Sequence, residues 1–163
     1  MNKKIYEKIM LYGGDILASD GMLSEKKYMH HGDISCYEHS VSVAEKSLAF
    51  AEFLSIKVDE RALVRGALLH DYFLYDWHTE GHGLHGFYHA ARALKNASED
   101  FELGDIERNI IIRHMFPLNI CPPGYAESWI VCAADKFCAM QEFFAKHGVG
   151  FVKHTKKSGD TKK

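Results

Sequence analysis

A histidine and an aspartate, His70 and Asp71, stand side by side at the end of the predominantly apolar run 62–69. Burying an imidazole and a carboxylate costs free energy unless a partner such as a metal ion replaces the lost water. Four more residues of types that bind divalent cations lie on other segments: His39, His89, His114 and Asp135. The sequence therefore predicts that these segments fold together around one or two divalent cations.

The neighbours of these residues decide between a metal site and ordinary core residues. Asp135 follows the apolar run 129–134, and His114 continues the helical row of Ile106 and Ile110. A single histidine on an apolar face is more often a hydrogen-bonded core residue, and a single buried aspartate more often pairs with a lysine or arginine. Six such residues on five predicted helices make independent accidents the weaker interpretation.

The composition bounds the class of protein. The 163 residues are 47% hydrophobic and 12% aromatic, which is typical of one globular domain. The net charge of -2 gives no electrostatic case for nucleic acid or an anionic membrane as a partner. No stretch of 18 uncharged apolar residues occurs, so we expect no membrane span, and the amino terminus lacks a signal-peptide pattern. We expect a cytoplasmic protein.

The four cysteines form no metal-binding or disulfide pattern. They are Cys36, Cys121, Cys132 and Cys138, and none of them is spaced as C-x-x-C. We expect buried thiols in a reducing compartment.

Apolar residues recur every three to four positions, and alternation with period two is nearly absent. This pattern predicts an all-α fold, a single compact domain of about six helices around the metal site. The helices are expected from Ile5 to about Ser19, from Ser35 to Leu54, from Asp59 to about His70, from Phe87 to about Ala97, from Asp105 to about Pro117 and from about Tyr125 to Lys146.

Local signals refine these limits. Ser35 and Glu38 form a capping box, and Asp59 and Asp105 are candidate N-caps. Residues 22–34 are expected to be a loop. Residues 1–150 would form the helical domain, and 151–163 a basic mobile tail. The last helix is expected to bury the following side chains in the core: Phe137, Met140, Phe143 and Phe144.

Three segments together resemble a known family. Tyr-Glu-His39-Ser, Leu-Leu-His70-Asp71 and Ala-Ala-Asp135-Lys resemble the His…His-Asp…Asp signature of the HD-domain superfamily of metal-dependent phosphohydrolases. The resemblance spans about residues 35–140. His89 and His114 are similar to two later histidines of the members with two metals. His85 is an alternative to His89, because Ala90 stands where proline is usual.

The resemblance implies a chemistry. A first metal would be bound by His39, His70, Asp71 and Asp135, and Asp71 would bridge to a second metal held by His89 and His114. Such ligands suit one or two ions of Mn, Fe, Zn, Ni, Co or Mg. A metal-activated water would hydrolyse a small phosphorylated metabolite or nucleotide. Asp71 would be the catalytic residue, as a ligand first and a proton acceptor second.

Alternatives stay open. The same ligands would serve a di-iron oxygenase of the superfamily, or a regulatory or binding module with a structural metal site.

Substrate contacts are a separate prediction. Lys136 and Arg113 are the candidates for binding the anionic substrate, with Arg92 comparable to them. His78 and His82 would contact substrate or belong to a solvated loop. No role is assigned to His30 or His31.

Overall fold

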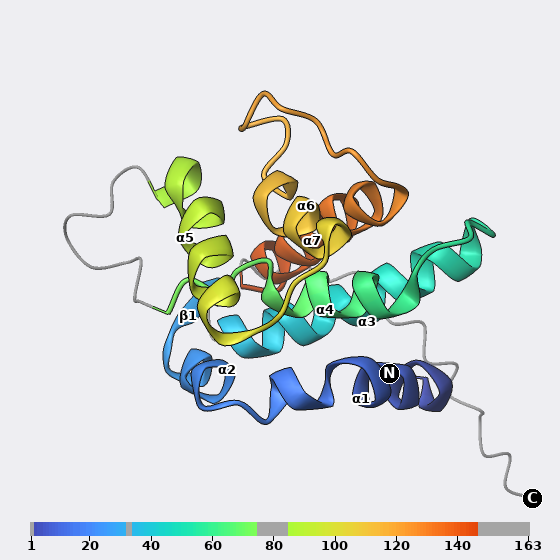
Figure 1. Cartoon of the computed structure of the whole chain (residues 1–163), viewed down its shortest axis with the longest axis horizontal. Coiled ribbons are helices and arrows are strands. Elements are labelled where there is room, and N and C mark those ends of the chain that lie inside the picture. Colours follow the sequence, from blue (N-terminus) through green and yellow to red (C-terminus); the bar gives the residue numbers. More distant parts are fainter. Residues whose placement is uncertain (1, 32–33, 75–84, 147–163) are drawn as a thin grey trace, which may run out of the picture.

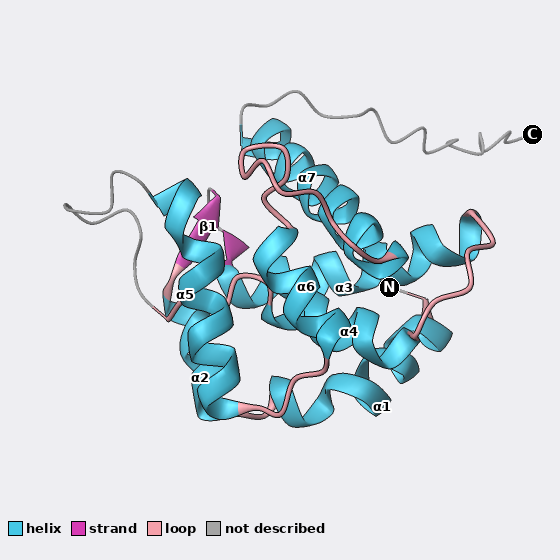
Figure 2. Ribbon diagram, turned by 45° about the horizontal axis from the view of Figure 1, so that its top comes forward, coloured by secondary structure: helices cyan, strands magenta, loops and turns pink. Residues whose placement is uncertain are grey.

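Helices dominate the computed structural model, which describes residues 2–31, 34–74 and 85–146 (Figure 2). In the described residues they are α1 (Lys3–Leu17), α2 (Asp20–Ser24), α3 (Cys36–Phe53), α4 (Glu60–Leu69), α5 (His85–Asp100), α6 (Asp105–Arg113) and α7 (Ala126–Lys146). The predicted all-α class is confirmed. The predicted 151–163 tail lies outside the described residues. No described helix is long and apolar enough to cross a bilayer.

Short-range hydrogen bonds fix where the helices begin. The capping box is present at the start of α3: the Ser35 hydroxyl accepts from the Glu38 N–H, and the Glu38 carboxylate accepts from the Ser35 N–H at 2.9 Å. The Asp59 side chain caps α4 by accepting from the Ala62 N–H at 2.9 Å. The prediction that Asp105 caps α6 is wrong. Gly104 is the N-cap, because the Glu107 carboxylate reaches back to its N–H and supplies the missing acceptor.

The segment 22–34, expected to be a loop, is largely ordered. It contains the end of α2, a 3₁₀ turn η1 (Glu25–Lys27) and strand β1 (Met29–His31), which pairs antiparallel with β2 (Ile34–Ser35). The Ser19 hydroxyl starts α2 by accepting from the Met22 N–H. Strands of two and three residues are too short to produce a period-two pattern, so the sequence could not predict this hairpin.

Helix α4 lies at the centre of the molecule. All of its residues from Ala62 to Leu69 are buried, and it packs against α1, α3 and α6 (Figure 1). Helix α7 packs on α3 and α6, and α5 covers α6. A central helix that is buried along most of its length can carry polar residues to the middle of the fold, as His70 requires.

Several predicted core positions are wrong. Met140 and Phe143 are about half exposed, because α7 turns Val131, Ala134 and Cys138 towards the core instead. The sequence also places Leu54 on the apolar stripe of the helix 35–54, but it is exposed because it lies beyond the last turn of α3. Three cysteines are buried as predicted, and Cys121 is exposed.

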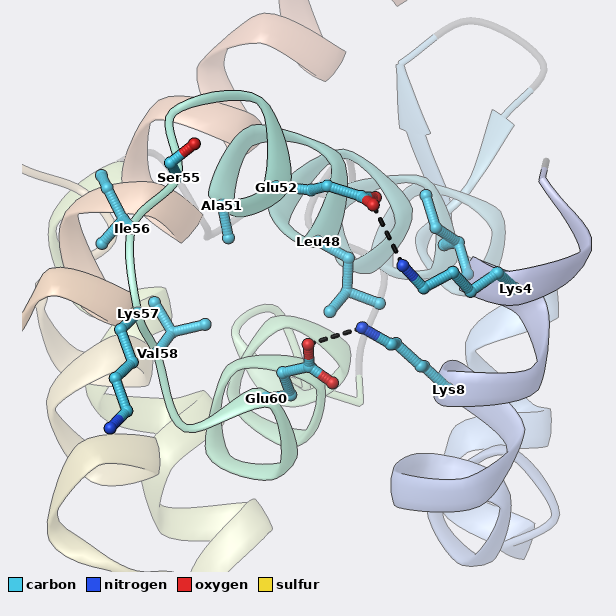
Figure 3. A pocket seen from close by; sticks show the side chains of 11 residues that line it. Lys4, Lys8, Leu48, Ala51, Glu52, Ser55, Ile56, Lys57, Val58 and Glu60 are labelled. Atoms are coloured by element: carbon cyan, nitrogen blue, oxygen red, sulfur yellow. Dashed lines mark hydrogen bonds and ion pairs between the residues drawn. The ribbon is translucent and has the colours of Figure 1, made fainter.

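Two ion pairs link α1 to α3 and to the start of α4. Lys4 contacts Glu52 at 3.0 Å and Lys8 contacts Glu60 at 2.5 Å, across a groove of about 350 Å³ (Figure 3). Lys57 points away from this groove. The groove lies towards the end of α3 opposite His39, and its facing charges are paired with each other.

A buried ionic network joins α1, α4 and α6. Arg65 is 5% exposed, and its guanidinium donates to both oxygens of Asp15 at 2.8 and 2.9 Å. Its Nε lies 3.2 Å from Oε1 of Glu107, which is 2% exposed. Arg61, on the surface, lies 3.7 Å from the same oxygen. Arg65 therefore compensates the charge of a carboxylate inside the fold.

Gly66 lets α4 approach α6. A Cβ atom at Gly66 would lie 2.5 Å from Cδ1 and 2.9 Å from Cβ of Ile110. We therefore expect Gly66→Ala to lower the free energy of unfolding by about 1–3 kcal/mol, because the two helices would have to separate. Urea denaturation measures this. As a matched control, a Cβ at Gly14 in α1 would meet only Met10 Cε at 3.9 Å. Gly14→Ala should stabilise the protein by about 0.5–1 kcal/mol through helix propensity. An equal increase in the free energy of unfolding in both variants would contradict the close approach of α4 to α6 at Gly66.

Candidate metal centre

The structure brings all six predicted ligand residues into one buried cluster. His39 lies in the first turn of α3, His70 ends α4 and Asp71 follows it, His114 ends α6, His89 lies in α5 and Asp135 in the middle of α7. Each of the six is at most 8% exposed. Segments separated by up to 96 residues therefore meet at one place.

Two of the histidines are oriented by the helix ends that carry them. The Nδ1 atoms of His70 and His114 lie 2.8 Å from the carbonyl oxygens of Ala67 and Ile111, three residues earlier. Carbonyls in the last turn of a helix have no partner within the helix, so these rings donate Nδ1–H to them. In the neutral ring each Nε2 then carries a lone pair that points into the cluster.

Asp71 faces two groups of imidazoles with its two oxygens. Its Oδ1 lies 3.3 Å from Nε2 of His89 and 3.3 Å from Nε2 of His114. Its Oδ2 lies 3.5 Å from Nε2 of His70. Asp71 therefore stands between the two halves of the cluster.

Asp135 completes the half that contains His70. Its Oδ1 lies 3.2 Å from Nε2 of His39 and 3.7 Å from Nε2 of His70. Within the described residues, two sets have ligand atoms close enough to share an ion: His70, His114 and Asp135, and Asp71, His89 and His114. Two further sets join His39, His70 and Asp71, and His30, His39 and Glu142.

Unsatisfied atoms test whether these residues fit a cation. Nε2 of His70 and Oδ1 of Asp71 are buried and have no hydrogen-bond partner in the described part of the protein. Nε2 of His89 and Nε2 of His114 lie 2.8 Å apart. Buried polar atoms without partners cost free energy, and a cation beside Nε2 of His70 and Oδ1 of Asp71 would satisfy both. The imidazole and carboxylate donors fit a divalent cation.

The electrostatics of the cluster favour ionised carboxylates. Burial alone raises the pKa of Asp71 and of Asp135, but the surrounding imidazoles hold both pKa values well below the usual range. Burial alone lowers the pKa of His70, but the charges of these two carboxylates raise it to about 9. The cluster thus keeps two negative charges in a largely buried place.

Two members of the cluster were not predicted. Glu142, on α7, lies 2.8 Å from Nδ1 of His39 and 3.0 Å from Nδ1 of His30. His30, on β1, also lies 3.4 Å from Oδ2 of Asp71. Glu142 follows Asp135 by seven residues, so the helical repeat could have placed both on one face. No sequence signal could have found His30, because its hairpin was not predicted.

The predicted substrate residues lie near the cluster. The Lys136 ammonium donates to the carbonyl oxygen of His114 at 2.7 Å and lies 3.9 Å from Oδ2 of Asp135. Arg113 is half-buried and forms no ion pair within the described residues. Substrate binding by either residue stays a prediction.

The remaining histidines lie outside the described side chains. His78 and His82 belong to the undescribed residues 75–84, and of His85 and His31 only the backbone is described. His89 lies in the cluster, with its Nε2 3.3 Å from Oδ1 of Asp71.

Glu25 is a buried carboxylate beside the cluster. Its Oε1 accepts from the Leu74 N–H at 2.9 Å, and burial, together with the charge of Asp71, raises its pKa from 4.5 to about 7. An acid whose pKa is raised by folding stabilises the protein most below its unfolded pKa, and the stabilisation is lost as the pH rises through 7. We expect Glu25→Gln to match the wild type near pH 4.5 and to exceed its free energy of unfolding above pH 7, by up to about 3 kcal/mol.

Urea denaturation in the presence of a chelator, at pH 5 and at pH 8, measures this difference. Glu99, an exposed carboxylate on α5, provides the control: Glu99→Gln should show no such change between the two pH values. A Glu25→Gln variant that is less stable than the wild type at pH 8 would show that the carboxyl is ionised at little cost.

Comparisons with known proteins identify one match. The model of the HD domain matches residues 36–140, more than half of the chain. No curated protein and no solved structure matches it. The matched range contains all six predicted ligands and ends before Glu142.

Proposed function

Because the chain belongs to the HD-domain family, we propose that it is a metal-dependent phosphohydrolase that acts on a small phosphorylated metabolite or nucleotide. One observation carries the proposal: Asp71 presents one oxygen to His70 and the other to His89 and His114. A carboxylate in that position can bridge two cations, as phosphoester hydrolysis by two-metal sites requires.

The ligands divide into two sets. His39, His70, Asp71 and Asp135 would hold one cation, and Asp71, His89 and His114 would hold a second. The divalent cations suited to these ligands are Mn, Fe, Zn, Ni, Co and Mg. Such a cation supplies activation of water near neutral pH and neutralises charge that develops on phosphoryl oxygens.

Other groups of the protein orient the ligand side chains and enclose the site. The carbonyl oxygens of Ala67 and Ile111 hold His70 and His114 in the tautomer that leaves Nε2 free of a proton. The ring of Phe73 lies edge-on against His89, with centroids 6.1 Å apart, and adds an apolar wall. In addition to binding the cation, Asp71 would act as a proton acceptor.

Two basic side chains beside the cluster are the candidates for binding the anionic substrate. The side chain of Lys136 is 45% exposed and lies next to Asp135, so its ammonium can reach a phosphate that enters there. Arg113 directly precedes His114 and is the second candidate. These two residues would select anionic substrates.

The decisive experiment combines metal analysis with hydrolysis. Protein purified without chelator or affinity metal is analysed for its elements, then stripped with a chelator and assayed on an aryl phosphate and a panel of phosphoesters. We expect the stripped protein to be inactive and a divalent cation to restore phosphate release, at the same rate with and without oxygen.

Three outcomes would overturn the proposal. Oxygen uptake with two irons per chain would favour a di-iron oxygenase. A metal that raises the melting temperature without phosphate release from any substrate would favour a structural site. Full activity after removal of all metal would show that the cluster binds no catalytic cation.

A further inference from the structure

His39 differs from the other histidines of the cluster in how its ring is held. His70 and His114 end their helices and donate to carbonyls that the helix leaves without partners. His39 lies in the first turn of α3, where the carbonyls of Ser35 and Cys36 belong to the hydrogen-bond ladder of the helix. Its ring therefore needs an acceptor from another element.

Glu142 provides that acceptor. Its Oε1 lies 2.8 Å from Nδ1 of His39, whose ring is fully buried, and the carboxylate reaches it from α7, two turns beyond Asp135. Nε2 of His39 forms a hydrogen bond with Oδ1 of Asp135 at 3.2 Å in this structure. When Nδ1–H donates to Glu142, the neutral ring has its lone pair on Nε2, where a cation would replace that hydrogen bond. The same tautomer results as in His70 and His114, by a different route.

The second oxygen of Glu142 holds His30. Nδ1 of His30 lies 3.0 Å from Oε2 of Glu142, and its ring stacks on that of His39 with centroids 3.6 Å apart and planes inclined by 21°. Nε2 of His30 lies 3.4 Å from Oδ2 of Asp71. One carboxylate thus fixes two stacked rings, and the hairpin carries the second ring over the cluster.

We propose that Glu142 is a positioning residue of the metal centre, which selects the tautomer of His39 and holds its ring in place for the cation. His30 is clamped by the same carboxylate and covers the outer face of His39. Both residues lie outside 36–140, so the family match does not assign them. This inference rests on the proposed metal site.

Two conservative variants separate positioning from charge. Glu142→Gln removes the charge and keeps the reach, so its amide oxygen can still accept from Nδ1 of His39. The amide NH₂ would face His30, whose ring can take the other tautomer and donate from Nε2 to Asp71. Glu142→Asp keeps the charge and shortens the side chain by one methylene. Gln141→Ala, on the exposed side of α7 next to Glu142, is the control for changes in the helix.

Titration of the stripped proteins with Co²⁺, followed by visible absorption, gives affinity and coordination together. We expect Glu142→Asp to weaken binding by about 10–100-fold and to change the absorption spectrum, because a displaced outer carboxylate misorients its histidine. Glu142→Gln should stay within a few-fold of the wild type with the same spectrum, and Gln141→Ala should equal the wild type.

The results distinguish this inference from the proposed function. A wild-type protein that binds no Co²⁺ would end both. If the wild type binds Co²⁺ and Glu142→Asp binds it with the same affinity and spectrum, only the positioning role of Glu142 is ruled out. If Glu142→Gln loses as much Co²⁺ affinity as Glu142→Asp, or more, then the charge of Glu142 matters and the choice of tautomer does not.

Discussion

Asp71→Asn is expected to lower phosphate release by at least about 10²–10³-fold, the cost of removing one electrostatic group from an active site. Asparagine has the shape of aspartate but no charge and only one acceptor oxygen, so it cannot face both His70 and the pair of His89 and His114. Elemental analysis should show less bound metal per chain than in the wild type. Circular dichroism should be unchanged, because Asp71 follows the end of α4.

A neighbouring carboxylate provides the control. Asp100 on α5 accepts from the hydroxyl of Tyr72 at 2.7 Å and contacts no member of the cluster. Asp100→Asn preserves an acceptor for that hydroxyl and should keep metal content and activity. If Asp71→Asn retains the metal content and the turnover of the wild type, then Asp71 is not required for metal binding or for hydrolysis.

The parts of the fold that the sequence predicts are those with local causes. The capping box at Ser35 and the cap at Asp59 depend on residues three positions apart, and both are present. Membership in the HD-domain family is confirmed, since order and spacing of the His and Asp segments carry it. The six candidate ligands converge, and cation binding by them stays a prediction.

The errors arise where distant contacts decide. A hairpin of two short strands has no period of its own, so His30 could not be placed beside Asp71. Apolar spacing on α7 does not say which side faces α3, and Phe143 is exposed as a result. The apolar spacing on α7 also does not reveal the role of Glu142, because that role depends on the ring of His39 on α3.

Arg65 in α4 is expected to carry a large share of the stability. Arg65→Met keeps the bulk of the side chain and leaves Glu107, 2% exposed, without its closest counter-charge. Removing one partner of a buried ion pair costs about 3–5 kcal/mol, and we expect a loss of that size in urea denaturation of the protein. Arg61, which is 60% exposed and 3.7 Å from the same oxygen, is the matched control. Arg61→Met should cost less than about 1 kcal/mol, as exposed pairs do.

A double variant shows whether the stranded charge is the cause. Glu107→Gln keeps the acceptor that reaches the Gly104 N–H but removes the buried negative charge. If the cost of Arg65→Met comes from that charge, Arg65→Met with Glu107→Gln will lose less than about half as much as Arg65→Met alone. Strict additivity of the two losses would instead attribute the effect to lost packing and to the contact with Asp15. Because α4 and α6 end in His70 and His114, the same network also sets how the helices that carry the two rings are held together.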